Sequence, residues 1–332
     1  MARSARPRIG LIGAGRWGKV YLKTLAALSD RCCLTHVATS QPSHGAVTRL
    51  PVAILREWRQ LLRADCDAII IATPPQMHAE MLEACLEVGK PCLVEKPLCL
   101  DVATAERLHR IVGASGVPVL VDHTQLFHPA YQALKQTLQQ AGEPVQVMMS
   151  EGMALGPFRE DVPALWDWGP HDVSLCIDLI GQPPAQVSAL GGPRDLQGAP
   201  EMVSLRLDFP GGACAWVQTG RLSTEKRRRL SVVTERHIYV CDDSAPHRLL
   251  VAPIEFSQRV TGGMPDSLEW QPLPSDTALS PMAAMLTAFL DGIESDKCDR
   301  FGTGLAVEVV RVLAAAEAEL GHTAYTRSVA RA

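Results

Sequence analysis

The residue whose type and position best suit catalysis is Lys96. It directly follows an apolar run, residues 91–95, that has the character of a short strand. If that strand is parallel to its neighbours, Lys96 lies at the sheet edge where open sheets bind ligands. There its ammonium group can donate to an oxygen and stabilise developing negative charge. The alternative is a surface lysine without a role. The chain must also reverse tightly after this strand, so we expect a cis peptide bond between Lys96 and Pro97.

A second candidate pair, Asp167 and His171, is spaced four residues apart. On a helix this spacing places both side chains on one face. Histidine titrates near neutral pH and can accept a proton from a hydroxyl group, and an adjacent carboxylate can orient its ring. The alternative is that His171 only caps a helix that begins there, with Asp172 as its partner. The residues by themselves do not separate these interpretations.

A glycine-rich turn lies between the first strand-like and helix-like segments, with Gly13, Gly15 and Gly18 in the spacing G-x-G-x-x-G. In this context the first glycine permits a tight turn, the second lets the backbone approach a pyrophosphate, and the third lets the helix pack closely on the sheet. The helix amino terminus adds N–H groups and partial positive charge. The turn therefore predicts a dinucleotide site; the alternative is a strand–helix turn without function.

The choice between NAD and NADP is normally made at the end of the second strand, where a carboxylate binds the ribose diol. Here the segment ends Thr39-Ser40-Gln41, without a carboxylate, and Arg49 follows nearby. This pattern leans toward NADP or dual use. The stretch from Gln41 to Pro51 is also short for a crossover.

The first third of the chain alternates strand-like and helix-like segments, which is typical of a parallel sheet with right-handed crossovers. We expect strands at 9–13, 34–39, 68–72, 91–95 and 117–121, and helices at 17–28, 55–62, 76–88 and 101–112, the last capped by Asp101.

The pattern changes after residue 123. We expect helices at 129–140, 171–179, 281–293 and 304–320, and strands at 145–150, 187–190, 202–209, 214–219, 230–233, 237–241 and 249–251. Consecutive strands joined by Gly/Pro turns indicate an antiparallel sheet. The predicted fold is therefore α/β. It has an N-terminal Rossmann domain with a doubly wound parallel sheet (1–123), and a C-terminal α+β domain with a large, mainly antiparallel open sheet (124–332).

Composition narrows the class of protein. The 332 residues carry a formal net charge of −4, which does not favour nucleic acid or an anionic membrane as a partner. No apolar run is long enough to span a bilayer. The ten cysteines form no C-x-x-C pair, which favours a reducing, cytoplasmic location. No cluster has metal-ligand spacing, so no metal is expected.

Further segments extend the pattern: Thr73-Pro74-Pro75-Gln76-Met77-His78 after the third strand, Glu95-Lys96-Pro97, and Asp167-Trp168-Gly169-Pro170-His171. With the glycine turn, these ordered motifs resemble the glucose–fructose oxidoreductase and inositol dehydrogenase (Gfo/Idh/MocA) family over essentially the whole chain. The resemblance implies NAD(P)-dependent sugar dehydrogenase activity, in which Lys96 polarises the reacting oxygen, His171 transfers the proton and Asp167 orients it. It implies cofactor contacts at Gly13, Gly15, Arg16, Trp17, Gly18, Ser40, Thr73, Pro74, His78, Glu95 and Lys96.

The link between the domains departs from the family pattern. Many relatives begin it with a small residue, an aromatic residue and then an arginine, whereas this chain has Asp122, His123 and Gln125. His123 is expected to face substrate or nicotinamide. Trp166 and Asp172 are further candidate substrate contacts, although a tryptophan near a helix start more often packs in a core. The sequence from Trp166 to Asp172 and the His123-Thr124 pair are most similar to those of family members that act on sugar nucleotides or amino-sugars.

Three hypotheses follow. The first is hydride transfer between NAD(P) and a secondary alcohol or ketone of a sugar, polyol or sugar nucleotide. The second is a non-catalytic nicotinamide sensor or scaffold on the same fold. The third keeps the enzyme but uses transient oxidation, followed by elimination or by hydride return between two sugars. In each case the broad sheet face predicts a homodimer or homotetramer.

Overall fold

The computed structural model describes residues 6–40, 51–156, 161–254, 268–275, 279–295 and 302–321. The chain divides into two compact units. The first comprises Met1–Phe127 with Ala278–Val310, and the second comprises His128–Thr277 with Arg311–Ala332. The single boundary expected at residue 123 thus differs from this division, because a late segment returns to the first unit.

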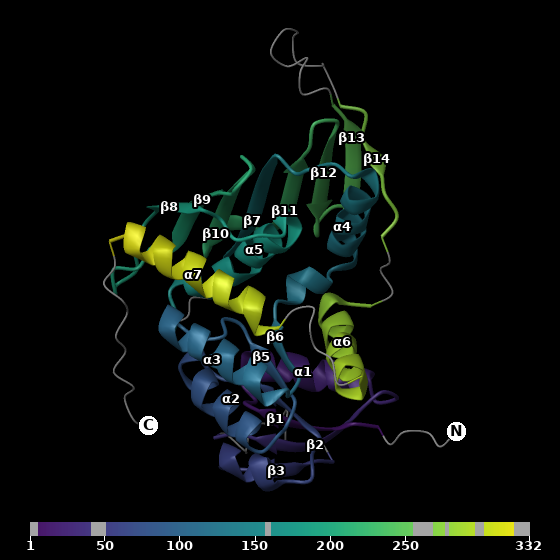
Figure 1. Ribbon diagram of the computed structural model, residues 1–332, viewed down its shortest axis with the longest axis vertical. Coiled ribbons are helices and arrows are strands. Elements are labelled where there is room, and N and C mark those ends of the chain that lie inside the picture. The colour runs from purple at the N-terminus through teal and green to yellow at the C-terminus, as the bar shows by residue number, and fades with distance from the viewer. Residues whose placement is uncertain are drawn as a thin grey trace. The chain divides into compact units, whose positions relative to one another are not determined.

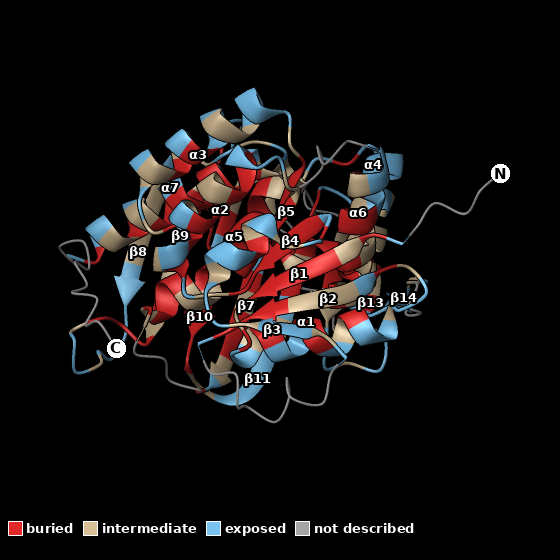
Figure 2. Cartoon of the chain, turned by 90° about the horizontal axis from the view of Figure 1, so that it is seen from below, coloured by how far each residue is buried: buried red, intermediate tan, exposed pale blue. Residues whose placement is uncertain are grey.

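The first unit is built on a parallel sheet of six strands in the order β3-β2-β1-β4-β5-β6. Its central strands are buried and almost wholly apolar because helices cover both faces of the sheet, as Figure 2 shows for β1, β4 and β5. The strands are β1 (Arg8–Ile12), β2 (Cys33–Ala38), β3 (Ala53–Leu55), β4 (Ala68–Ile71), β5 (Cys92–Glu95) and β6 (Val119–Asp122).

The helices of this unit are α1 (Arg16–Ala27), α2 (His78–Glu87), α3 (Val102–Ser115) and α6 (Pro281–Ser295). Helix α2 packs beside α3, and α6 beside α1 (Figure 1). Asp101 caps α3 by accepting from the Thr104 amide at 2.8 Å, as expected. The helix expected at 55–62 was wrong, because Ala53–Leu55 pairs with β2 as an edge strand and only Trp58–Arg63 turns, as a 3₁₀ helix.

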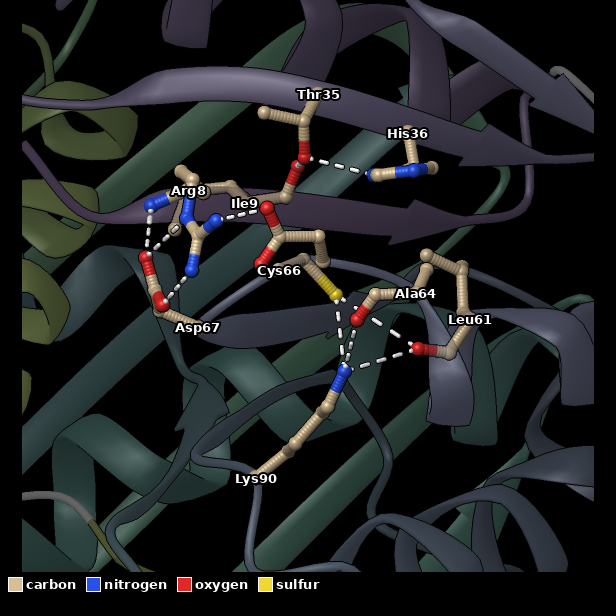
Figure 3. A network of polar contacts seen from close by, with 10 residues as sticks. Arg8, Ile9, Thr35, His36, Leu61, Ala64, Cys66, Asp67 and Lys90 are labelled. Carbon is tan, nitrogen blue, oxygen red and sulfur yellow. Dashed lines mark hydrogen bonds and ion pairs between the residues drawn. The ribbon is translucent and has the colours of Figure 1, made fainter.

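The amino edge of the parallel sheet is closed by its own polar contacts (Figure 3). Arg8 donates to the Asp67 carboxylate through its side chain, at 2.8 and 3.1 Å, and through its amide at 2.7 Å. The Lys90 ammonium donates to the carbonyls of Ala64 and Leu61, at 2.8 and 3.1 Å. These two sets of contacts satisfy their own polar groups, and the candidate cofactor-binding residues lie at the opposite, carboxyl ends of the strands.

The second unit contains a sheet of eight strands in the order β14-β13-β12-β11-β7-β10-β9-β8. All neighbouring pairs are antiparallel except β7 and β10, which run parallel. The strands are β7 (Val147–Leu155), β8 (Gln186–Gly191), β9 (Met202–Asp208), β10 (Cys214–Gly220), β11 (Leu222–Val233), β12 (His237–Asp242), β13 (Leu249–Pro253) and β14 (Gln271–Pro272). The predicted fold class, a Rossmann domain followed by a mainly antiparallel sheet, is confirmed.

Two helices cover one face of this sheet: α4 (Pro129–Ala141) packs on β12 and β13, and α5 (Ala164–Ile180) on β7, β9 and β10. The last helix, α7 (Thr303–Glu319), contains the division between the units. In the described parts of the chain, no helix combines the length and apolarity needed to cross a membrane.

Candidate active site

The phosphate-binding turn has the geometry that its glycines predicted. Gly13 has φ +96°, and a Cβ there would lie 2.3 Å from the Ala72 carbonyl oxygen. A Cβ on Gly18 would lie 2.2 Å from the Gly13 carbonyl oxygen. Both glycines are therefore required by the protein's own packing.

Gly15 differs, because no atom lies within 4 Å of the place a Cβ would take. Helix α1 begins at the next residue, so Gly15 is its N-cap and offers no side chain to accept hydrogen bonds from the first-turn amides. The turn thus presents an open backbone surface and helix N–H groups, which fit the pyrophosphate of a dinucleotide. Arg16 and Ser40 are exposed, and Trp17 is half-buried. Gln41 and Arg49 lie outside the described residues.

His78 joins the two loops that follow β4 and β5. Its side chain is fully buried, with Nδ1 2.9 Å from the Pro97 carbonyl oxygen and Nε2 2.9 Å from the Thr73 carbonyl oxygen. Burial lowers the pKa of this imidazole below its usual value. Its partners are the T-P-x-x-x-H and E-K-P segments themselves, so His78 holds those loops together. Of the motif residues beside it, Pro74 is exposed and Thr73 half-buried.

Lys96 follows the last residue of β5 and is 7% exposed. Its peptide bond to Pro97 is cis, which confirms the prediction. Its backbone amide donates to Oε2 of Glu95 at 3.2 Å. The lysine is therefore held at the carboxyl edge of the parallel sheet, as expected from its position after the strand.

Buried titratable side chains surround this strand end. Glu95 stands opposite Asp122 in the β5–β6 register, and the Tyr21 hydroxyl donates to the Asp122 carboxylate. Burial, and then the charge of Asp122, raise the pKa of Glu95 well above its usual range. Burial also raises the pKa of Asp122. Tyr21 was not singled out from the sequence, where nothing distinguishes it from other aromatic residues of an amphipathic helix.

His123 is 1% exposed, and neither ring nitrogen has a hydrogen-bond partner within the described ranges. Burial, helped by the nearby Lys96 charge, lowers its pKa to about 3. His123 is therefore neutral at physiological pH. The structure places it in the Lys96 neighbourhood, and its expected contact with substrate or nicotinamide stays a prediction.

In the second unit, α5 carries Asp167 and His171 one turn apart. The helix begins at Ala164 rather than at 171, so the alternative in which His171 caps the helix start is wrong. His171 is 5% exposed. Gly169 lets α7 approach, because a Cβ there would lie 2.9 Å from a methyl carbon of Leu313.

Arg221 was missed in the sequence. Its fully buried guanidinium lies 3.5 Å from Asp167 Oδ2 and 3.7 Å from Glu201 Oε1, and donates to the Val162 carbonyl at 2.7 Å. Arg221 lies between β10 and β11. In the sequence, nothing distinguishes it from other basic residues at polar strand ends. Asp167 is thus fixed by a buried cation.

The other two candidate substrate contacts are buried. Trp166 is 2% exposed and its indole N–H donates to Glu317 of α7 at 3.1 Å, which matches the alternative of core packing. Asp172 is also 2% exposed and accepts from the Ser150 hydroxyl at 2.7 Å. Burial raises its pKa, although the Arg228 charge opposes this effect. Among the residues that the structure describes, no group of His, Cys, Asp or Glu is arranged to hold a metal ion.

Known protein families match segments in both units. Residues 7–123 match the oxidoreductase family with an NAD-binding Rossmann fold, and residues 139–240 match the GFO/IDH/MocA C-terminal domain. A crystal structure described as that of an oxidoreductase from Magnetospirillum magnetotacticum is 36% identical, with a TM-score of 0.83. That match covers 94% of this chain and 99% of the other.

The chain belongs to the Gfo/Idh/MocA family. Two curated relatives of this oxidoreductase are the UDP-N-acetylglucosamine 3-dehydrogenase of Acidithiobacillus ferrooxidans, 28% identical, and inositol 2-dehydrogenase 2 of Paenarthrobacter aurescens, 30% identical. The first match covers 68% of this chain and 70% of the relative, and the second covers 58% and 61%.

Proposed function

We propose that this Gfo/Idh/MocA protein transfers a hydride between NAD(P) and a secondary alcohol or ketone of a sugar-type substrate, and that a sugar nucleotide is the first candidate. The observation that carries the proposal is Lys96, held at the carboxyl edge of a parallel sheet that also bears an open phosphate-binding turn. The curated UDP-N-acetylglucosamine 3-dehydrogenase supports the sugar-nucleotide class. Membership of an oxidoreductase family favours catalysis over a sensor or scaffold.

The turn at Gly13, Gly15 and Gly18 would hold the pyrophosphate, and bound nicotinamide supplies the hydride acceptor or donor. The Lys96 ammonium donates to the reacting oxygen and stabilises the charge that develops on it. His171 accepts the hydroxyl proton during oxidation and returns it during reduction. Asp167 orients His171, and Arg221 fixes the Asp167 carboxylate. The other cofactor contacts expected, from Arg16 to Glu95, are part of the same proposal.

The choice between NAD and NADP depends on the end of β2. Ser40 is exposed there, and the segment through residue 40 has no carboxylate. These features favour NADP or dual use over strict use of NAD.

The proposed assembly is a homodimer or homotetramer that packs through the face of the eight-stranded sheet opposite α4 and α5. On neighbouring strands of that face, Met149 and Trp216 are paired in register and are 43% and 46% exposed. Leu190 on β8 is 75% exposed. Solvent-facing apolar side chains on a broad sheet favour a second copy of the same chain as partner. The free thiols of the described cysteines favour a reducing compartment such as the cytoplasm.

The experiment that tests the function begins with fluorescence titrations of the purified protein with NADH and with NADPH. Tight binding of one establishes the cofactor, which is then supplied in a screen of sugars, polyols and UDP-sugars for absorbance change at the reduced nicotinamide band. A denatured extract is checked for cofactor that copurifies. Absence of binding together with a cofactor-free extract would contradict the proposal.

A further inference from the structure

The polar residues near Lys96 come from α1, β5, β6 and the 3₁₀ turn that follows β6. Tyr21 lies on α1, one turn beyond the last glycine of the phosphate-binding turn, and its hydroxyl donates to Asp122 Oδ2. Thr124, after β6, donates to Asp122 Oδ1. Asp122 and Glu95 are opposite one another at the ends of β6 and β5.

If both carboxyl groups are ionised, one of their four oxygen atoms has no hydrogen-bond donor among the described residues. Each oxygen of Asp122 accepts from a hydroxyl, and Oε2 of Glu95 accepts from the Lys96 amide. Glu95 Oε1 is buried and has no donor in the described part of the chain. Glu95 and Asp122 are register partners on adjacent parallel strands, so their side chains project from the same face of the sheet beside one another. Two carboxyl groups hydrogen-bond only when one carries a proton.

The charge balance gives the same answer. Asp122 is 1% and Glu95 is 4% exposed, and Lys96 is the cation that acts on both. Two buried carboxylates and one ammonium group would leave one uncompensated negative charge out of contact with solvent. Burying such a charge destabilises the folded protein. One proton on the pair makes the cluster neutral. His123 adds no charge, because burial keeps its pKa at about 3.

We propose that Glu95 and Asp122 share one proton as a buried acid pair, and that Asp122, held by Tyr21, is a positioning residue for Lys96. The pair joins the ends of β5 and β6, and Tyr21 joins that connection to the helix of the phosphate-binding turn. Glu95 in turn holds the Lys96 backbone amide. The arrangement fixes the strand end from which Lys96 projects, in a cluster of zero net charge. The positioning role rests on the proposed hydride transfer, but the shared proton does not.

The shared proton is tested by infrared spectroscopy of the wild-type protein, with aspartate and glutamate carrying ¹³C-labelled side-chain carboxyl groups in separate preparations. At pH 7 we expect a carbonyl stretch of a protonated carboxylic acid that shifts with at least one label. Burial raises the pKa of both acids, and the band should disappear as the pH rises and the pair loses its proton. Asp122→Asn and Glu95→Gln should each remove it, and Asp30→Asn, an exposed control, should not. A wild-type spectrum without the band overturns the shared proton whatever the enzyme's activity.

The positioning role is tested by comparing Asp122→Asn with Asp122→Leu. An asparagine amide can donate to ionised Glu95 and accept from Tyr21, so it keeps these two hydrogen bonds and loses only the one from Thr124, whereas leucine keeps none of them. We expect Asp122→Leu to lower kcat by about tenfold or more, because small displacements of a reacting group are costly. The Kd for reduced cofactor should change by less than about threefold, and Asp122→Asn should recover most of the kcat loss.

The pH profile gives a second readout. Wild-type kcat should fall with rising pH as the pair loses its last proton, and Asp122→Asn should lack that limb. Equal loss in the Asn and Leu variants, or a loss confined to KM, overturns the positioning role. If Asp122→Leu does not fold, the Asn profile and the infrared band still decide. Failure to bind NADH or NADPH would instead contradict the proposed function and leave the infrared result standing.

Discussion

At the scale of single residues, the phosphate-binding turn separates the requirements of folding from those of ligand binding. A Cβ on Gly18 would collide with backbone, whereas a Cβ on Gly15 would enter open space. We predict that Gly15→Ala leaves the Tm of the cofactor-free protein within about 1–2 °C but weakens NADH or NADPH binding at least about tenfold, because the added methyl group blocks the backbone's approach to the pyrophosphate.

Gly18→Ala is the matched variant. It should lower the Tm of the cofactor-free protein, because either α1 or the turn must move to admit the methyl group. Differential scanning fluorimetry and fluorescence titration measure the two effects. If Gly15→Ala binds cofactor like the wild type, the pyrophosphate does not lie against this glycine.

Lys96 is expected to act in the transition state more than in cofactor binding. Lys96→Met keeps most of the side-chain length but removes the ammonium donor, so kcat should fall by about 100-fold or more. The Kd for reduced cofactor should stay within about threefold of wild type. Lys23→Met, on the exposed side of α1, is the control. Turnover near the wild-type value in Lys96→Met would remove this lysine from the mechanism.

His123 should make stability depend on pH. Its folded-state pKa of about 3 is below the unfolded value of about 6.5, so the unfolded chain binds more protons between these values. Its contribution to stability is therefore present above about pH 6.5 and lost as the pH falls toward 3. At pH 5 the loss relative to pH 7 is about 2 kcal/mol.

The measurement is urea unfolding of wild type and His123→Phe at pH 5 and pH 7. The difference between the proteins isolates this histidine from the nearby acids, whose raised pKa values act in the opposite direction. A wild-type protein that loses no more stability on acidification than His123→Phe would show that His123 is already charged or exposed in the folded state.

At the scale of elements, patterning predicted the strands and helices because each buries a regular face. The alternation around β4 and the turn-bounded strands after residue 185 are local signals of this kind. The start of α5 was missed by seven residues, because Pro170 within the helix looked like a boundary. Lys96, Asp167 and His171 were found by motif. Tyr21 and Arg221 were not, since their roles depend on partners 101 and 54 residues away.

Arg221 gives the prediction at this scale. Arg221→Met should lower the free energy of unfolding by about 3–5 kcal/mol, because it leaves Asp167 and Glu201 buried without their cation. Urea denaturation measures this loss. Arg59→Met is the control: its pair with Glu80 is exposed to solvent on both sides and should contribute less than about 1 kcal/mol. Equal stability changes in the two variants would contradict a buried ionic role for Arg221.

At the scale of the whole molecule, the division into units could not be read from local sequence. Residues 278–310 follow every strand of the large sheet, yet they group with the first unit, where α6 packs beside α1 and the His109 Nδ1 lies 2.8 Å from the Thr303 hydroxyl. Amphipathic helices show which face is buried but not which sheet they cover. Helix α6 and the first part of α7 thus belong to a unit that the chain order separates from them.

The last prediction concerns the oligomeric state and rests on the face of the eight-stranded sheet opposite α4 and α5. Along β7, β9 and β10, buried residues alternate with half-buried or exposed ones, so one side of each strand packs under α5 and the other faces away from it. Met149 and Trp216 lie on that second side. Burying them against a second copy gains apolar area that α4 and α5 do not cover. Light scattering should therefore give a dimer or tetramer at micromolar concentration. Trp216→Glu should shift it toward monomer, because a charge would be buried at the contact. Leu196→Glu, on a fully exposed residue outside the strands, should leave the mass unchanged. A wild-type monomer would mean that this face remains in solvent.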